Sequence, residues 1–341
     1  MKAIVYSQTG DPDVLTLRER PLPEPGPGEV RVQVRVSGVN PTDWKARRGS
    51  SPGQPAAFAE VVPNQDGAGI VDAVGPAVAE TRLGERVWLW EAAWQRPDGT
   101  AQEYVVLPAR QAVPLPDGAS FDLGASLGIP ALTAHRALTV ADGGPDRLAP
   151  GTLAGRTVLV AGGAGAVGNA AIQLARWAGA GVVTTVSSAE KAALASAAGA
   201  QHVVNYRAGD AAAMIREAAP DGVDVVVEVA PAANAALDEA VLAPNGTVAV
   251  YATDGGGDLR LPAFPLMAKN VRYQFVLVYT VSEPAKDRAV EDVSRAVAEG
   301  ALRVGEEAGL PLHRFPLADT AAAHAAVEAG AVGKVVIDLG S

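Results

Sequence analysis

A glycine pattern in the middle of the chain constrains the fold most. Residues 158–180 read VLVAGGAGAVGNAAIQLARWAGA, in which Gly163, Gly165 and Gly168 have G-x-G-x-x-G spacing between an apolar run and a helix-like stretch. We expect the first glycine to permit a tight turn, the second to let a pyrophosphate approach the backbone, and the third to let the helix pack on the strand. The chain has 37 glycines, so chance could produce this spacing. The flanking strand and helix, with a second apolar run after them, favour a dinucleotide site.

The pattern of apolar residues predicts two kinds of sheet. TVLVA, VVTTV, VDVVVEV and TVAVY are apolar without alternation and lie between Ala-rich helical stretches. This is typical of parallel strands in a doubly wound α/β sheet. The first 115 or so residues look mostly β, because VRVQVRV alternates and further short β-like runs follow, as in a partly open barrel. Near the end, VRYQFVLVYTV predicts another strand, followed by an amphipathic helix near 283–300 and then helix, glycine turn and strand.

The end of the second apolar strand indicates which nucleotide is bound. An NAD site usually has Asp or Glu about 20 residues after the glycines, to bind the ribose 2′-hydroxyl. This chain has Ser187 and Ser188 there, with Lys191 close behind. Hydroxyls and an ammonium suit a 2′-phosphate, so we expect NADPH. Alternatively, Ser187 to Glu190 is only an S-x-x-E capping box, with Lys191 on a solvated helix face.

Composition excludes several classes of function. The chain has no cysteine, which rules out disulfides, thiolate nucleophiles and Cys-ligated metal sites. Its net charge of −10 argues against a nucleic-acid partner. The N-terminus does not read as a signal peptide, and no apolar run reaches membrane-spanning length, so we expect a cytoplasmic protein with no membrane partner.

Nearly the whole chain resembles the zinc-free quinone oxidoreductases, the zeta-crystallin-like family of the medium-chain dehydrogenase/reductase superfamily. The resemblance rests on GEVRVQVRVSGVNPTDWKARRG, PNQDGAGIVDAVG, GIPALTAHRAL, AGGAGAVG, AGAQHVVNYR and GKVVIDL. It implies a GroES-like catalytic domain made of residues 1–125 and 305–341. Residues 126–304 would form a Rossmann domain, with NADPH in the cleft. It also implies a homodimer formed through the strand VRYQFVLVY.

The resemblance also assigns residues to the cofactor. Gly165 to Gly168 would hold the pyrophosphate, and Thr133 would lie beside the nicotinamide. The implied cofactor-binding residues are Thr133, Gly163, Gly165, Ala166, Val167, Gly168, Ser187, Ser188, Lys191, Tyr206, Val250, Tyr251, Ala252, Thr253, Phe275, Val276, Leu277 and Val278. Alternatively, Tyr206 only covers a loop between helix and strand, and Thr133 only caps or packs a helix. The VRYQFVLVY run could be plain core.

No metal is expected. In zinc-dependent relatives the position of Asn40 is a metal-binding Cys, and those of Gln65 and Asp66 are a His-Glu pair. Asn and Gln at the first two of these positions cannot rebuild a three-ligand zinc site.

The loop SGVNPTDWKARRG, residues 37–49, has no Cys and no His, and hydride transfer to a quinone suits such a loop. The reduced oxygen is a phenolate, whose conjugate acid has a pKa of about 10, so neutral hydrogen-bond donors can stabilise it. We therefore expect Asn40, Thr42 and Gln65 to be catalytic, with Thr42 relaying a proton. Asp43, Trp44 and Asp66 would line the substrate site. Asn40 could instead be a turn residue, Asp43 could accept backbone N–H bonds in an Asx-turn, and Trp44 could be core. For His135 we expect a place on a helix surface.

Two other activities remain open. One is the NADPH-dependent reduction of α,β-unsaturated ketones or enoyl thioesters, whose enolate must be protonated at carbon and therefore needs an acid more. Relatives commonly have a Tyr after the R-x-G of this loop, whereas this chain has Ser50 and Ser51, which favours quinones. The other is NADPH binding with little catalysis. Trp88, Trp90 and Trp94, near an insertion-like EAAWQRPDG, also leave the substrate open.

Overall fold

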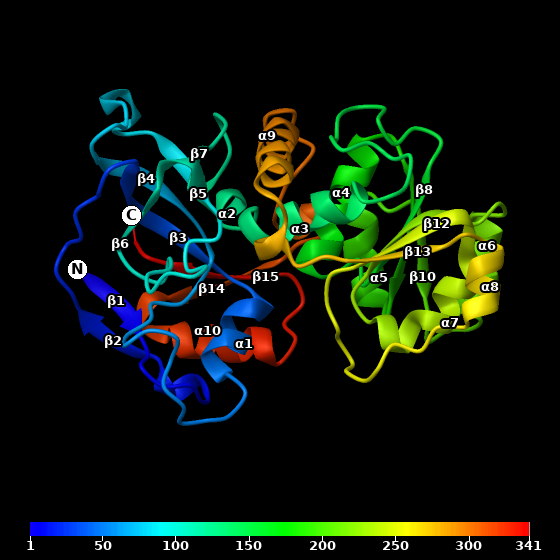
Figure 1. Cartoon of the computed structure of the whole chain (residues 1–341), viewed down its shortest axis with the longest axis horizontal. Coiled ribbons are helices and arrows are strands. Elements are labelled where there is room, and N and C mark those ends of the chain that lie inside the picture. Colours follow the sequence, from blue (N-terminus) through cyan, green and yellow to red (C-terminus); the bar gives the residue numbers. More distant parts are fainter. Residues whose placement is uncertain (341) are drawn as a thin grey trace. The chain divides into compact units, whose positions relative to one another are not determined.

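The chain forms two compact units (Figure 1). The computed structural model describes residues 1–340. Unit 1 contains Met1–Ile129 and the C-terminal segment that begins at Leu312, and unit 2 is Pro130–Pro311. The two ends of the chain therefore share a unit. The division falls at 129/130 and 311/312, against sequence-based boundaries at 125/126 and 304/305.

Unit 1 is built on a sheet with the strand order β14-β15-β3-β4-β5-β7, in which β6 also pairs with β3. The pairs are antiparallel except β14–β15, and β1 and β2 form a separate antiparallel pair. The strands are β1 Lys2–Val5, β2 Thr16–Glu19, β3 Glu29–Val39, β4 Asp66–Val74, β5 Arg86–Leu89, β6 Tyr104–Pro108, β7 Ala112–Pro114, β14 Leu312–Pro316 and β15 Lys334–Asp338. Its helices are α1 Pro41–Arg48, α2 Phe121–Gly124 and α10 Thr320–Glu328. Helix α3, Gly128–Leu138, runs across the 129/130 boundary.

The alternating valines of β3 form the centre of the unit 1 core. Val30, Val32 and Val34 are at most 2% exposed and lie in one cluster with Leu89 and Leu107. Because β15 pairs with β3, the C-terminal strand completes the same sheet. This pairing brings the start of β15 beside the end of β3, where α1 begins.

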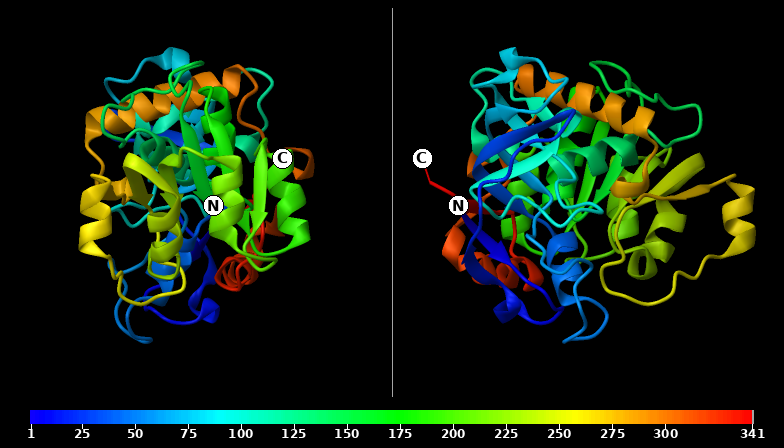
Figure 2. Two further views of the ribbon diagram at one scale, coloured as in Figure 1. Left: turned by 90° about the vertical axis from the view of Figure 1, so that its right-hand side faces the viewer. Right: turned by 60° about the vertical axis from the view of Figure 1, so that its left-hand side comes forward.

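Unit 2 is a parallel sheet of the Rossmann type. Its strand order is β10-β9-β8-β11-β12-β13, and every pair is parallel. The strands are β8 Thr157–Ala161, β9 Gly181–Val186, β10 His202–Asn205, β11 Val223–Glu228, β12 Leu242–Val250 and β13 Arg272–Phe275. The helices are α4 Ala166–Trp177, α5 Ala189–Ala197, α6 Ala211–Ala218, α7 Pro231–Val241, α8 Ala263–Ala268 and α9 Glu283–Ala298. The left view of Figure 2 faces this unit and shows green and yellow helices beside its strands.

The strand order reverses between β8 and β11, which are neighbours in the sheet. Dinucleotides bind at such a switch point, beyond the carboxyl ends of the strands. The glycine turn follows β8 directly, so unit 2 places it at this point.

The last strand of unit 2 is shorter than the sequence pattern predicts. The run VRYQFVLVYTV contains β13 only as far as Phe275, and a 3₁₀ turn follows at Val278–Thr280. Strand β12 ends at Val250, which pairs with Phe275. Beyond Phe275, β13 has no partner in β12, and the strand therefore ends there. The 3₁₀ turns are η1 Pro12–Val14, η2 Glu80–Arg82, η3 Ala109–Gln111, η4 Val278–Thr280, η5 Glu306–Ala308 and η6 Leu317–Asp319.

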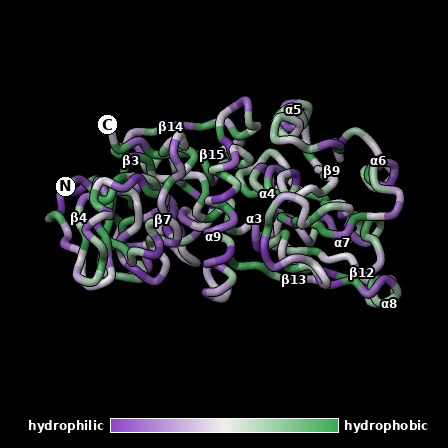
Figure 3. The backbone as a smooth tube through the Cα atoms, turned by 90° about the horizontal axis from the view of Figure 1, so that it is seen from above, coloured by the Kyte–Doolittle hydropathy of each residue, from purple (hydrophilic) through white to green (hydrophobic). Residues whose placement is uncertain are grey.

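Hydrophobic and hydrophilic residues alternate in short stretches along the backbone (Figure 3). Among the described helices, none combines the length and the apolar character that crossing a membrane requires.

Candidate active site

The glycine turn links β8 to α4, and each glycine has its own steric reason. Gly162 has a φ of +70°, the left-handed conformation that favours glycine. A Cβ on Gly163 would lie 2.1 Å from Thr184 Oγ1 on β9, and one on Gly168 would lie 2.4 Å from the Gly162 carbonyl oxygen. The Gly165 N–H bonds to the Gly162 oxygen at 3.0 Å, so Gly163 lies inside the predicted turn. The positive φ of this turn belongs to Gly162, and Gly163 lets the turn pass close to β9.

Gly165 lies directly before α4, and the space beside its Cα is almost empty. A Cβ there would have one neighbour within 4 Å, the Gly162 carbonyl oxygen at 3.5 Å. Ala166 and Val167, the first two helical residues, are only partly buried. Their N–H groups belong to the first turn, which has no partners within the helix, so they can bind an anion. This geometry fits the expected pyrophosphate site.

A polar corner forms where β9 ends and α5 begins. Lys191 Nζ lies 3.2 Å from Ser187 Oγ. The Tyr206 backbone N–H bonds to the Val186 oxygen at 3.1 Å, and 48% of Tyr206 is exposed. Ser187, Lys191 and Tyr206 are thus brought together.

The helix cap at this corner differs from the capping-box alternative. Ser188 is the N-cap of α5, and its Oγ accepts the Lys191 N–H at 3.2 Å. Ser187 is therefore outside the helix, with its hydroxyl turned to the Lys191 ammonium. Lys191 is partly buried, and its ammonium lies beside the Ser187 hydroxyl. An ammonium and a hydroxyl in this arrangement can bind a phosphate.

The ends of β12 and β13 lie side by side, which joins the two segments expected near the nicotinamide. Val250 pairs with Phe275, and the Val276 N–H bonds to the Val250 oxygen at 2.7 Å. Val276 and Val278 are buried, whereas Phe275 and Leu277 are 62% and 51% exposed. After Val250, Tyr251 and Ala252 are partly buried and Thr253 is exposed. Thr133 lies on α3 and is 5% exposed.

A buried polar cluster in unit 1 surrounds Asn40. Lys334 Nζ donates to Asn40 Oδ1 at 2.7 Å and to Asp66 Oδ2 at 3.1 Å, and Asn40 Nδ2 donates to Asp66 Oδ2 at 2.7 Å. The Ile129 N–H donates to Asp66 Oδ1 at 2.8 Å. Asn40, Asp66 and Lys334 are 3%, 0% and 1% exposed, so this triangle is interior. Asp66 contacts protein groups on both oxygens, and it holds Asn40 in place instead of lining a surface as expected.

Asp43 ties the start of α1 to the strand before it. Its Oδ2 accepts the Asn40 backbone N–H at 2.7 Å, as the Asx-turn alternative expected. Burial, together with the charge of Asp66, raises the pKa of Asp43 to about 8, although the N–H groups of Asn40 and Gln65 act in the opposite direction. Asp43 is thus a buried carboxyl group that holds its proton more strongly than an ordinary Asp.

The other expected site residues of unit 1 are more accessible. Thr42, Trp44 and Gln65 are partly buried, so Trp44 is not simply core. Gln65 Oε1 accepts the Ala93 N–H at 3.0 Å. Since its oxygen accepts the Ala93 N–H, Gln65 has its Nε2 hydrogens left as donors.

The residues around Asn40 do not fit a zinc ion. Asn40 Oδ1 and Asp66 Oδ2 are both occupied by the Lys334 ammonium, whose charge repels a cation. Within residues 1–340, no three or more His, Cys, Asp or Glu side chains group in a way that could hold a metal. The donor set that zinc requires is therefore missing from the described part of the chain.

Lys334 was missed by the sequence analysis, although it has a recognisable signal. It is the one charged residue at the start of the apolar run KVVI near the C-terminus. A lysine that begins a buried strand must find a partner, because an unpaired buried charge is costly. Its partners Asn40 and Asp66 are more than 260 residues away, with separations of 294 and 268.

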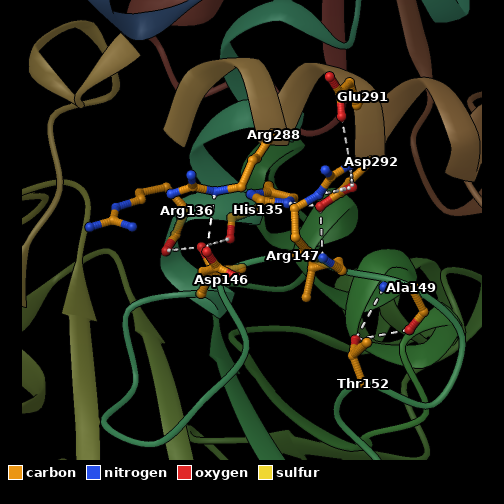
Figure 4. Close-up of polar contacts among 11 residues, drawn as sticks. His135, Arg136, Asp146, Arg147, Ala149, Thr152, Arg288, Glu291 and Asp292 are labelled. Atoms are coloured by element: carbon orange, nitrogen blue, oxygen red, sulfur yellow. Dashed lines mark hydrogen bonds and ion pairs between the residues drawn. The ribbon is translucent and has the colours of Figure 1, made fainter. Parts of the chain in front are cut away.

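His135 is not on a helix surface, and this expectation is wrong. It is 1% exposed, and its Nε2 lies 2.8 Å from Asp292 Oδ2 on α9 (Figure 4). Arg147 Nε and the Leu148 N–H also donate to Asp292, at 2.8 and 2.7 Å. Burial lowers the pKa of His135 more than its bond to Asp292 raises it. The group joins α3, α9 and the loop between α3 and β8, which is a structural role.

Family models match both units. The model described as "Alcohol dehydrogenase GroES-like domain" matches residues 26–117, and the one described as "Zinc-binding dehydrogenase" matches residues 166–295. Among curated proteins, the quinone oxidoreductase of Lama guanicoe is 30% identical over 345 residues, which are 99% of this chain and 97% of that protein. The Rattus norvegicus quinone oxidoreductase is 29% identical with the same coverage.

Solved structures agree over the full length. A mycobacterial protein complexed with NADPH has a TM-score of 0.81 and 31% identity, with 99% of each chain covered. The Escherichia coli quinone oxidoreductase complexed with NADPH has a TM-score of 0.80 and 25% identity, covering 99% of this chain and all of that one. A structure described as an NAD-dependent alcohol dehydrogenase has a TM-score of 0.86 and 29% identity, with full coverage of both chains. The structural likeness thus extends to proteins that use either nucleotide.

Proposed function

The chain belongs to the zeta-crystallin-like quinone oxidoreductase family of the medium-chain dehydrogenase/reductase superfamily, and from this premise we propose that it transfers hydride from NADPH to a quinone-type acceptor without a metal ion. The observation that carries the proposal is the identity of about 30% along the whole chain with quinone oxidoreductases. As a member of this family the protein is an oxidoreductase.

The choice of NADPH is supported by the corner at Ser187. A bound 2′-phosphate would meet the Lys191 ammonium and the Ser187 hydroxyl, which lie 3.2 Å apart, beside the exposed ring of Tyr206. An NAD site usually has a carboxylate at the end of the second strand, and Ser187 and Ser188 take that place here. NADPH, when bound, supplies the hydride. The first turn of α4 would hold its pyrophosphate, and the ends of β12 and β13 would hold its nicotinamide.

The choice of a quinone is supported by the neutral character of the hydrogen-bond donors expected at the site. Asn40 Nδ2 and Gln65 Nε2 are amide donors, and Thr42, two residues after Asn40, carries a hydroxyl. Such groups orient an acceptor and stabilise a developing phenolate. A simple ketone would leave an alkoxide, which needs a stronger electrophile such as a metal. The donor set around Asn40 does not fit that metal.

A comparison of acceptors tests the proposal. We expect NADPH oxidation with 9,10-phenanthrenequinone at a kcat/KM at least about tenfold above that with 2-cyclohexenone or crotonyl thioesters, because these need a proton at carbon. Robust reduction of the enone or thioester without quinone turnover would contradict the proposal and establish the alternative acceptor. Tight NADPH binding without turnover on any of them would contradict both.

We also propose that the protein is a homodimer that pairs through β13. This strand is the edge of the unit 2 sheet, so its outer backbone groups have no strand beside them within the described chain. Phe264 and Met267 on α8, the helix before β13, and Phe275 on β13 are 79%, 71% and 62% exposed. An exposed apolar edge strand favours pairing with a second copy.

A further inference from the structure

The triangle of Asn40, Asp66 and Lys334 joins three segments that are distant in the chain. Asn40 follows β3, Asp66 begins β4 and Lys334 begins β15, and these strands are neighbours in the sheet. The three contacts within the triangle measure 2.7, 2.7 and 3.1 Å. Every group that contacts the Asp66 carboxylate donates to it, as suits the ionised form.

Lys334 decides which way the Asn40 amide faces. A lysine ammonium can only donate, so the amide atom beside it must be Oδ1, and Nδ2 must turn to Asp66. The triangle uses one Nδ2 hydrogen, and none of the described contacts of the Asn40 amide uses the second. One orientation of the amide therefore gives Asn40 one donor direction.

Without Lys334 both restraints on the amide would weaken. Burial raises the pKa of Asp66, while the Lys334 ammonium and the Asn40 amide lower it. With the ammonium removed, Asp66 would take up a proton more readily. A neutral carboxyl can donate as well as accept, so it could bond to either end of the Asn40 amide, and the amide would populate two orientations.

The surrounding backbone gives the triangle little room to rearrange. A Cβ on Gly38 would lie 2.1 Å from the Ala125 carbonyl oxygen and 3.0 Å from both Asp66 Cβ and Lys334 Cε. A Cβ on Gly128 would lie 2.4 Å from Asp66 Oδ1. Two glycines thus let the backbone close directly around the Asp66 carboxylate and the Lys334 stem, which holds both in place.

We propose that Lys334 is a positioning residue of this enzyme: from its buried place between Asn40 Oδ1 and Asp66 Oδ2 it holds the Asn40 amide in the one orientation that presents the second Nδ2 hydrogen to the acceptor oxygen. This role rests on the proposed function of Asn40 as a donor. In this role the Lys334 ammonium orients Asn40 in addition to neutralising the charge of Asp66. The C-terminal strand β15 thereby acts on the reacting groups through Lys334.

An NMR experiment tests the orientation without using turnover. The chain has seven Asn residues, so ¹⁵N-Asn labelling gives seven side-chain NH₂ pairs, and Asn40→Ala identifies that of Asn40. We expect one sharp Asn40 pair in the parent and in Lys334→Arg, and a doubled or broadened pair in Lys334→Met. An unchanged sharp pair in Lys334→Met would overturn the proposal. If Lys334→Met does not fold, Lys334→Met/Asp66→Asn removes both charges and is read in the same way.

A double-mutant cycle tests the consequence for catalysis. We expect Lys334→Met to lower kcat about tenfold, with Lys334→Arg nearer the parent, and with the KM for NADPH nearly unchanged. In the Asn40→Ala background, Lys334→Met should lower kcat by less than about twofold, because Lys334 acts through the amide that has already been removed. Equal losses in both backgrounds would show a merely structural role and overturn the proposal. The cycle uses whichever acceptor the parent reduces, so a wrong acceptor class does not affect it. If the parent reduces none, the NMR result decides.

Discussion

At the scale of a single residue, we expect Lys191 to determine the preference for NADPH over NADH. Its ammonium lies 3.2 Å from Ser187 Oγ in a corner without a strand-end carboxylate. A hydrogen bond to a charged group is worth about 1.5–3 kcal/mol. We therefore expect Lys191→Ala to raise the KM for NADPH about tenfold or more and to leave that for NADH within about twofold, measured by steady-state kinetics.

The neighbouring residue offers a matched control for Lys191. Glu190 lies on the same first turn of α5 and is exposed, so Glu190→Ala perturbs the helix without removing the ammonium. It should leave the ratio of the two KM values near that of the parent. Equal increases for both nucleotides in Lys191→Ala would remove the basis for assigning NADPH.

Single residues were also where sequence reasoning reached its limit. The spacing of Gly163, Gly165 and Gly168 located the turn. The positive φ belongs to Gly162, which lies outside this spacing. Gly163 is needed because a Cβ there would clash with Thr184 on β9. Lys334 could not be paired with Asn40 from sequence, since their contact depends on β15 lying beside β3. Local spacing predicts local geometry, whereas a contact across 294 residues needs the sheet topology.

At the scale of secondary-structure elements, the His135–Asp292 contact joins α3 to α9 and should make stability depend on pH. Burial lowers the pKa of His135, and bonds from His135, Arg147 and Leu148 lower that of Asp292 although burial raises it. Both groups bind fewer protons in the folded state than in the unfolded one, so their stabilisation is complete above their ordinary pKa values and is lost as the pH falls. For His135 the loss begins below a pH of about 6.5.

His135→Gln tests this contact while keeping a donor for Asp292. We expect the free energy of unfolding of the parent to fall more steeply between pH 7.5 and 5 than that of His135→Gln, by up to about 1.4 kcal/mol per pH unit. Urea unfolding at several pH values measures both slopes. His202 is exposed, and His202→Gln should follow the parent. Parallel slopes for the parent and His135→Gln would show that the imidazole is not held neutral.

Elements were predicted well wherever the apolar pattern was continuous. Strands β8, β9, β11 and β12 of unit 2 and the alternating strand β3 follow from TVLVA, VVTTV, VDVVVEV, TVAVY and VRVQVRV. The run VRYQFVLVYTV was the exception, because it stops being a strand where its neighbour β12 ends. A strand boundary set by a partner is not visible in the strand's own sequence.

At the scale of the whole molecule, the β13 edge predicts association. Helix α8 leads into this strand, since the Val271 N–H bonds to the Leu266 oxygen at 3.1 Å, and its Phe264 and Met267 are the most exposed large apolar residues described. We expect the parent to sediment at twice the mass of one chain. Phe264→Glu/Met267→Glu should shift it toward the monomer, because burying two carboxylates at an interface is costly.

A substitution elsewhere controls for a general effect of added charge. Leu17 in β2 is also apolar and 46% exposed, so Leu17→Glu should leave the sedimentation unchanged. A parent that sediments as a monomer at micromolar concentration would contradict the dimer.

The central claim, hydride transfer from NADPH to a quinone without a metal, is tested most directly by turnover after metal removal. The protein is dialysed against a strong chelator, its metal content is measured, and NADPH oxidation with 9,10-phenanthrenequinone is followed with and without added zinc. The Lys334 ammonium between Asn40 Oδ1 and Asp66 Oδ2 leads us to expect full activity in the metal-free protein and no gain from zinc. Activity that is lost with the metal and restored by zinc would contradict the account.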